Sequence, residues 1–369
     1  MKNKIEFWQP CVGKYEYELI KEVLDSNYLN EGAVTDKFEK ELAALLGVKY
    51  AIAVTSGTAA LFLALYALGI GPGDEVIVPD LTFIATANAV TMCGARAVLV
   101  DIDADTFNMS PVAFAGAITK QTKAVIPVHM SGRAANLPEI MDIAEKRNIA
   151  VIEDAAQALM SLHNGKPLGT YGLMGCFSFS PNKTITTGQG GLVITNDDNL
   201  NVRLHQLKDQ GRAVRGNAGD DLHPVVGFNF KFTNLQSAIG LGQLQMLETR
   251  VKRLRQTYSV YKDMLKTVPG IRLLDFNVES GETPQWIDAL VDNRNELEAA
   301  LSKKNIYCRR FYYPLHKQKP YFQDDRNFPN SSNLLSKAIW LPSDFTLGDE
   351  DITKVCEEIM TFMRASRSA

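Results

Sequence analysis

From residue 49 to residue 158, short apolar segments alternate with longer segments of helical spacing, and this alternation constrains the fold more than any other feature. The apolar segments read KYAIAVTSG, EVIVPD, RAVLVDID, TKAVIPVHM and IAVIED. Nearly uninterrupted apolar runs of this length are typical of parallel strands that are buried on both faces. Strands that alternate with helices predict an α/β domain with a mostly parallel sheet.

The rest of the chain predicts a second, smaller unit. Two short helices open the chain, and we expect Thr35 to be the N-cap of the second, which ends at Gly47. An extended loop is expected over 211–234, and one continuous helix over 235–261. Beyond about Val268 the segments IRLLDF, WIDALV and NELEAALSKKN indicate a smaller α+β unit. We therefore expect a large domain at 1–250 and a small C-terminal domain at 251–369.

Composition excludes several classes of protein. No apolar run approaches the roughly 20 residues of a membrane span, and no apolar segment follows the basic N-terminal residues as in a secretory signal. We therefore expect a cytoplasmic protein. The net charge of −3, without a dense basic stripe, argues against a nucleic-acid partner. Five widely spaced cysteines without a CxxC pair favour neither disulfides nor a metal site.

Lys183 stands between the strand-like CFSFS and the glycine-containing TITTGQGG. A lysine in such a setting is suited to act as a buried catalytic amine. To accept a proton it must be neutral for part of the cycle, which burial and a nearby cation favour by lowering its pKa. An ordinary loop lysine is the more common explanation of this spacing alone.

Other polar and aromatic residues follow predicted strands, where ligands bind in parallel sheets. Asp154 ends IAVIED and could pair with a cation such as the pyridinium of pyridoxal 5′-phosphate, or could cap the next helix. The turn 56–58, Ser-Gly-Thr, precedes a helix and suits a phosphate, although it is also an ordinary N-cap. Ser178 could add a hydroxyl, and Phe83 could stack on a flat ring; backbone bonding and core packing are their alternatives. His129 is expected to be a structural histidine.

Five segments, in order, carry a resemblance to a known family: AVTSGTAAL, VIVPDLTFIATANAV, VIEDAAQA, FSFSPNKTITTGQGGLVITND and GFNFKFTNLQSAIGLGQL. They resemble the DegT/DnrJ/EryC1/StrS family of nucleotide-sugar aminotransferases, which belongs to fold type I of the pyridoxal phosphate enzymes. The resemblance covers nearly the whole chain. It implies an aspartate aminotransferase-like, three-layer large domain.

The resemblance also implies roles for single residues. Lys183 would form the Schiff base with pyridoxal phosphate, and the cofactor would alternate with pyridoxamine phosphate. Asp154 would pair with the pyridinium nitrogen, and Gln157 would lie beside the ring. The implied phosphate ligands and stacking residue are Ser56, Gly57, Thr58, Ser178 and Phe83. Asn229 would reach the phosphate of the neighbouring subunit, which implies a homodimer with shared active sites.

Two positions matter for the reaction and the pocket. A dehydratase branch of the family has histidine in place of the lysine, so the lysine of this chain favours amino transfer. Met160 stands where a small residue is common, which leaves the wall of the pocket undetermined.

The segment 307–322, YCRRFYYPLHKQKPYF, is dense in aromatic and basic residues. Such residues suit a sugar nucleotide, although an ordinary strand and turn would also account for them. RRFYYPLH with NKTITTGQGG is similar to the perosamine synthase branch, which aminates C4 of GDP-4-keto-6-deoxymannose. By this resemblance Tyr313 and His316 would lie near the sugar, and Arg309 or Arg310 near the diphosphate.

The implied reaction moves an amino group from glutamate to a nucleotide-linked 4-keto-6-deoxyhexose. Amination at C3 and a dTDP- or UDP-linked substrate are alternatives that the motifs leave open. A non-catalytic regulator that binds pyridoxal phosphate or a sugar nucleotide is an alternative of another class.

Overall fold

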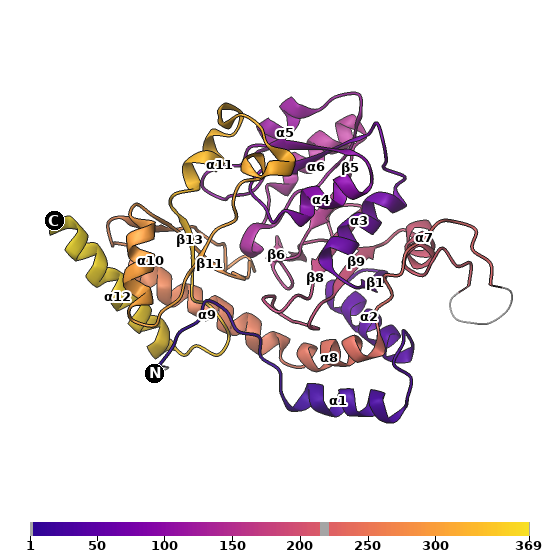
Figure 1. Cartoon of the computed structure of the whole chain (residues 1–369), viewed down its shortest axis with the longest axis horizontal. Helices are drawn as coiled ribbons and strands as arrows, with labels where there is room; N and C mark the ends of the chain where they lie inside the picture. Colours follow the sequence, from indigo (N-terminus) through magenta and orange to yellow (C-terminus); the bar gives the residue numbers. More distant parts are fainter. Residues whose placement is uncertain (1–2, 215–220, 369) are drawn as a thin grey trace.

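The computed structural model describes residues 3–214 and 221–368, and within them a seven-stranded sheet forms the centre of the larger part (Figure 1). Its strands, in spatial order, are β1 (Tyr50–Val54), β9 (Gly191–Thr195), β8 (Met174–Ser178), β5 (Ala150–Asp154), β4 (Thr122–Val125), β2 (Glu75–Pro79) and β3 (Arg96–Val100). Only β9 runs antiparallel to its neighbours in this sheet. The α/β class with a mostly parallel sheet is therefore confirmed.

Helices cover both faces of this sheet. One face is covered by α3 (Gly57–Ala67), α4 (Ala85–Met92) and α7 (Asp198–Lys208), and the other by α2 (Ala33–Leu46), α5 (Pro111–Ala117) and α6 (Leu137–Arg147). Alternate residues of one strand enter different cores: Ile52 packs with α3, whereas Ala53 packs with α2. Because both faces are covered, the strands carry no polar alternation.

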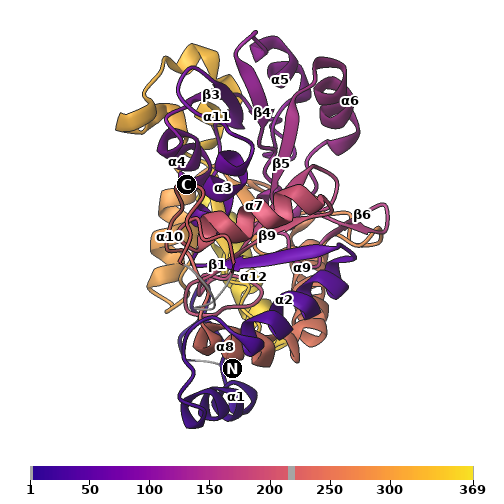
Figure 2. The same cartoon turned by 90° about the vertical axis from the view of Figure 1, so that its right-hand side faces the viewer.

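The helix predicted as continuous over 235–261 is two helices, α8 (Asn234–Leu244) and α9 (Leu247–Leu265). Met246, with φ −103° and ψ 1°, separates them. The apolar spacing continues across the break, so the pattern did not reveal it. α8 packs on α2 and on α1 (Lys14–Asp25), at the lower end of the molecule in Figure 2. A Cβ on Gly240 would lie 2.5 Å from the Phe38 ring, so glycine permits this close packing.

The expected cap of α2 was also wrong. The N-cap is Gly32, and Thr35 lies inside the helix. Its hydroxyl donates to the carbonyl of Phe232 (3.1 Å), so the side chain joins α2 to the start of α8 instead of capping. The expected loop over 211–234 contains no helix or strand in its described parts, 211–214 and 221–233. Residues 215–220 lie outside the described residues.

A second, antiparallel sheet lies in the C-terminal part, at the left of Figure 1. Its order is β10 (Ile271–Leu273), β11 (Ile287–Val291), β13 (Ala338–Leu341) and β12 (Arg309–Arg310). It shares a core with α9, α10 (Arg294–Ser302) and α12 (Asp349–Ser368). Ile5 belongs to this core and bridges Ile306. The division of the chain at residue 250 stays a prediction.

Short elements complete the fold. These are β6 (Leu162–His163), β7 (Lys166–Pro167), α11 (Pro329–Leu334) and the 3-10 turns η1 (Met130–Gly132), η2 (Leu315–Lys317), η3 (Lys319–Tyr321) and η4 (Asp325–Asn327). Among the described helices, none is both long and apolar enough to cross a membrane.

Candidate active site

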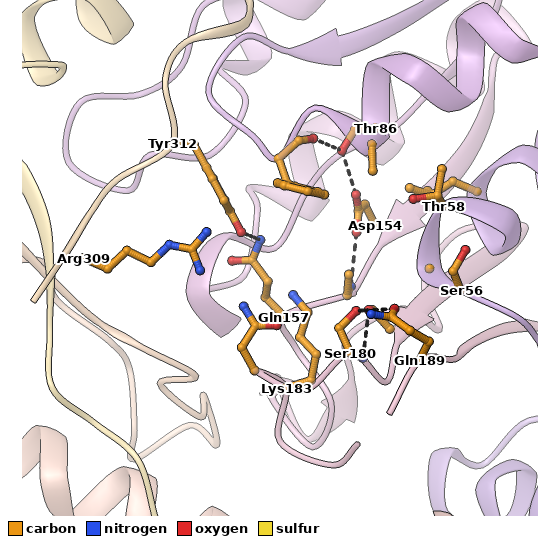
Figure 3. Close-up of a pocket in the computed structure, with 17 residues that line it drawn as sticks. Ser56, Thr58, Thr86, Asp154, Gln157, Ser180, Lys183, Gln189, Arg309 and Tyr312 are labelled. Atoms are coloured by element: carbon orange, nitrogen blue, oxygen red, sulfur yellow. Dashed lines mark hydrogen bonds between the residues drawn. The ribbon is translucent and has the colours of Figure 1, made fainter. Parts of the chain in front are cut away.

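A cavity of about 300 Å³ opens where the carboxyl ends of β5 and β8 meet the N-terminus of α3 (Figure 3). Its lining combines residues of the central sheet with residues of the C-terminal part. The lining residues are Ser56, Gly57, Thr58, Leu61, Phe83, Ala85, Thr86, Asp154, Ala156, Gln157, Ser178, Ser180, Asn182, Lys183, Gln189, Arg309 and Tyr312.

Lys183 lies in the connection between β8 and β9, and its side chain points into the cavity with Gln157 and Asp154 (Figure 3). Burial lowers the pKa of its ammonium to about 8, because desolvation outweighs the attraction of Asp154, and the Arg309 guanidinium adds to the lowering. The amine also lies 4.9 Å from the centre of the Trp286 ring. A lysine with this pKa is neutral often enough near neutral pH to accept a proton.

Asp154 is the last residue of β5 and is almost completely buried. Its Oδ2 accepts a hydrogen bond from the Thr86 hydroxyl (2.8 Å), and its Oδ1 accepts one from the Ala156 N–H (3.2 Å). Burial raises the pKa of the carboxyl, and these two donors act against the rise. A carboxylate held in this way could bind a cation inside the cavity.

Hydroxyl groups and a helix N-terminus gather at another side of the cavity. α3 begins at Gly57, and its first N–H groups have no partner within the helix. The hydroxyls of Ser178 and Ser180 are 3.1 Å apart, beside this turn. A Cβ on Gly57 would lie 2.9 Å from the Cβ of Ser178, so glycine allows α3 to approach β8. The arrangement suits a phosphate group.

Arg309 and Tyr312 lie across the cavity from Ser56 and Thr58 (Figure 3). The rings of Tyr312 and Phe83 are 5.6 Å apart. The Gln157 amide Nε2 donates weakly to the Tyr312 hydroxyl (3.4 Å). This side therefore offers a guanidinium and aromatic faces to a second molecule.

The residues present fit pyridoxal phosphate. Asp154 could hold the pyridinium nitrogen, the start of α3 with Ser178 could hold the phosphate, and Lys183 supplies an amine to the same cavity. Among the described residues, no cluster of His, Cys, Asp and Glu could hold a metal ion.

Four residues that the sequence predicted for the site do not line this cavity. The Arg310 guanidinium pairs with Glu298 (2.7 Å), because successive residues of β12 point to opposite sides. His316 is completely buried, and its Nδ1 lies 2.6 Å from Asp80 Oδ2. Tyr313 is half exposed, and Asn229 is exposed outside the cavity.

His129 is a structural histidine, as expected: its Nε2 lies 2.8 Å from Glu153 Oε2, and its Nδ1 accepts from the Ala135 N–H (3.1 Å). Met160, in doubt as a pocket wall, does not line the cavity either. Thr86 and Tyr312, among others, line the cavity although they were not predicted for it. The density of aromatic and basic residues in 307–322 was the available signal for Tyr312, whereas Thr86 gave none.

Comparison with known proteins shows what the chain is similar to. The family model of the DegT/DnrJ/EryC1/StrS aminotransferase family matches residues 10–360. A GDP-perosamine synthase of Escherichia coli O157:H7 is 38% identical over 365 residues, covering 97% of this chain and 98% of the relative.

Solved structures agree with the family match. A putative sugar aminotransferase of Streptococcus pneumoniae in a PMP form has a TM-score of 0.94 at 26% identity, covering 99% of both chains. DesI, solved in the presence of its TDP-sugar product, has a TM-score of 0.91 at 29% identity, covering 100% of this chain and 95% of DesI.

Proposed function

Because this chain belongs to the DegT/DnrJ/EryC1/StrS aminotransferase family and is a pyridoxal phosphate-dependent enzyme, we propose that it transfers an amino group from glutamate to C4 of a GDP-linked 4-keto-6-deoxyhexose. The similarity to a GDP-perosamine synthase supports the substrate. One observation supports the reaction: Lys183, whose pKa is lowered, and the buried carboxylate of Asp154 line the same cavity.

Each residue of the site has a physical task in this reaction. Bound here, pyridoxal phosphate supplies an aldehyde that takes up the amino group and a ring that withdraws electrons from the reacting bond. Asp154 would keep the proton of the ring nitrogen in place by its negative charge. The N-terminus of α3 and Ser178 would hold the phosphate. Phe83 would offer an aromatic face to the ring.

Lys183 moves the proton in both halves of the reaction. Its Nζ would accept the proton from Cα of the donor amino acid and return it to the cofactor carbon that carries the amino group. In the second half it would move a proton the opposite way, to the sugar carbon that receives the amine. Arg309 and Tyr312, across the cavity from Ser56, would contact the sugar nucleotide or the donor's carboxylate.

The test is a panel of keto sugar nucleotides given to the enzyme loaded with pyridoxal phosphate, with glutamate as donor. We expect the GDP-linked 4-keto sugar to be turned over, with the amine at C4 by NMR. Lys183→Ala should abolish turnover. A Lys183→Ala protein that still aminates a keto sugar would show that the lysine is wrongly assigned.

A second candidate differs in the nucleotide or in the carbon that is aminated. DesI, solved with its TDP-sugar product, is similar over this whole chain and favours a dTDP-linked substrate as the alternative. The same panel separates the two, because each nucleotide and each product amine position gives a distinct result.

The proposal includes a cytoplasmic homodimer that makes a deoxyamino sugar, for example for lipopolysaccharide O-antigen. In it Asn229, exposed and outside the cavity of its own subunit, would contribute to the partner's phosphate site. Mixing Lys183→Ala and Asn229→Asp proteins, each nearly inactive, should then restore part of the activity, since some sites of the mixed dimer have both residues intact. Sedimentation or light scattering gives the oligomeric state directly. A fully active Asn229→Asp protein would argue against shared sites.

A further inference from the structure

We propose that Gln285 is a positioning residue for Lys183, because its side-chain amide holds the residues on both sides of that lysine. The inference rests on the role proposed above for Lys183 and is independent of the sugar. Gln285 lies far from Lys183 in the sequence, just before β11, and only 1% of it is exposed.

The side-chain amide of Gln285 contacts the residues directly before and after Lys183. Gln285 Nε2 donates to the carbonyl of Asn182 (3.2 Å), and the Thr184 hydroxyl donates to Gln285 Oε1. The carbonyl of Thr184 also accepts from Arg250 Nη1 (3.0 Å). The backbone that carries Lys183 is thus fixed before and after the lysine by buried side chains. A hydrogen bond of a buried amide adds modestly to the stability of the fold. Removing its partner leaves a buried donor or acceptor unsatisfied, which costs more free energy.

The same residue supports a second side chain of the cavity. The Gln285 N–H donates to the carbonyl of Ser131 (2.8 Å), and the Ser131 N–H donates to Gln157 Oε1 (2.8 Å). Ser131 has φ 54°, in the left-handed region that is uncommon for a residue other than glycine. Its hydroxyl donates to Asp288 Oδ1 (2.6 Å), which helps to hold this conformation. One segment therefore positions both Lys183 and Gln157.

The neighbour of Gln285 completes the arrangement. Trp286 is completely buried, and its ring centre lies 4.9 Å from the Lys183 amine. The charged groups that act on this amine are the Asp154 carboxylate and the Arg309 guanidinium. Since burial is the main cause of the lowered pKa of Lys183, a turn that moves toward water should raise that pKa.

Two substitutions test these contacts, one at Gln285 and one at Thr184. Gln285→Met removes both amide contacts at similar volume, and Thr184→Val removes one hydroxyl without changing the segment before β11. In the full chain without cofactor, the reactivity of Lys183 toward acetic anhydride is followed against pH by peptide mass spectrometry. We expect its apparent pKa to move from about 8 toward 10.5 in both variants, more in Gln285→Met.

The loaded enzymes provide the second readout. Misplacing the amine should lower kcat by about 10- to 100-fold in Gln285→Met and less in Thr184→Val, while KM for the donor changes far less. Matched controls are Thr257→Val, at a buried threonine whose hydroxyl has no partner among the described residues, and Gln256→Met, at an exposed glutamine on α9. Both controls should leave the labelling curve and kcat unchanged.

The proposal is overturned if the labelling curve of Lys183 is unchanged and kcat stays within twofold of wild type in folded Gln285→Met and Thr184→Val. The contacts of Gln285 then do not position the lysine. If Gln285→Met does not fold, Thr184→Val alone decides. Activity retained in Lys183→Ala would instead refute the proposed function, which keeps the two failures apart.

Discussion

At the scale of single residues, the protonation of Lys183 and Asp154 depends on two opposing effects, burial and the attraction between their charges. Desolvation favours the neutral form of both, lowering the pKa of the ammonium and raising that of the carboxyl. Their mutual attraction, and the Thr86 hydroxyl on Asp154, favour the charged forms. The protonation of the site is therefore set by a few contacts that single substitutions can change.

Thr86→Val should move the acidic limb of the pH–rate profile to higher pH. The Thr86 hydroxyl lowers the pKa of Asp154, so its loss raises that pKa and fewer molecules carry the carboxylate at a given acidic pH. The measurement is kcat/KM against pH for the loaded enzyme. Thr91→Val, on the same helix and bonded to Tyr321 instead, is the control. An unchanged acidic limb would show that the hydroxyl does not act on Asp154.

Lys183→Met should stabilise the cofactor-free protein at pH 7, and this gain should shrink at alkaline pH. Below about pH 8 the folded protein carries a desolvated ammonium, so the penalty is complete. Between about 8 and 10.5 the unfolded chain binds more protons, so wild-type stability rises with pH. Because Lys183 is only partly buried, solvent screens its charge, and the pH-dependent part of the stability is roughly 1 to 2 kcal/mol.

Urea unfolding at pH 7 and pH 10 measures this difference. Lys146→Met, at an exposed lysine on α6, reports how pH affects the protein as a whole. An equal gain for Lys183→Met at both pH values would contradict a lowered pKa in the folded state.

At the scale of elements, α3 is the helix on which the site depends most. It is buried on nearly all sides between the sheet and its neighbouring helices, and its first turn faces the cavity. The Ser56 hydroxyl accepts from the Ala59 N–H (3.1 Å). The sequence could not separate a cap from a phosphate ligand, and the geometry shows that Ser56 is at least the cap.

Ser56→Ala should lower the free energy of unfolding by about 1 kcal/mol through loss of the cap, and should also weaken pyridoxal phosphate binding. Ser110→Ala is the matched control, because Ser110 caps α5 in the same way (3.3 Å to the Ala113 N–H) away from the cavity. It should cost similar stability without changing cofactor affinity. Equal cofactor affinities in both variants would place the phosphate elsewhere.

At the scale of the whole molecule, a buried ion pair joins the central sheet region to the C-terminal sheet. Arg133, which follows η1, lies 3.0 Å from Asp288 of β11, and both are almost completely buried. Trp340 Nε1 donates to the same carboxylate (2.8 Å). The cavity draws residues from both regions, so this contact bears on the site as well as on stability.

Asp288→Leu should destabilise the protein by about 3 to 5 kcal/mol, because it leaves the Arg133 guanidinium buried without its partner. The double variant Arg133→Met/Asp288→Leu should recover part of the loss. Urea denaturation measures both, and Asp142→Ala, which breaks an exposed pair with Lys146, should change stability by less than about 1 kcal/mol. A double variant no more stable than Asp288→Leu would rule out the unpaired charge as the cause.

The sequence by itself determined the α/β class and brought Lys183, Asp154 and the turn 56–58 to one place. It could do so because the carboxyl ends of parallel strands meet at one edge of a sheet. Residues that directly follow such strands in the chain therefore lie near one another in space. Apolar runs and their spacing are local properties, so they are visible without the fold. The break between α8 and α9 was not visible, because the apolar spacing continues through it.

Only the tertiary structure decided which side chains of 307–322 reach the cavity. Arg309 and Tyr312 line it, whereas His316 is held by Asp80 in the interior. It also brought Gln285 to the two sides of Lys183. These outcomes depend on how the C-terminal sheet packs against the central one, and contacts between residues a hundred positions apart leave no periodic trace in the sequence.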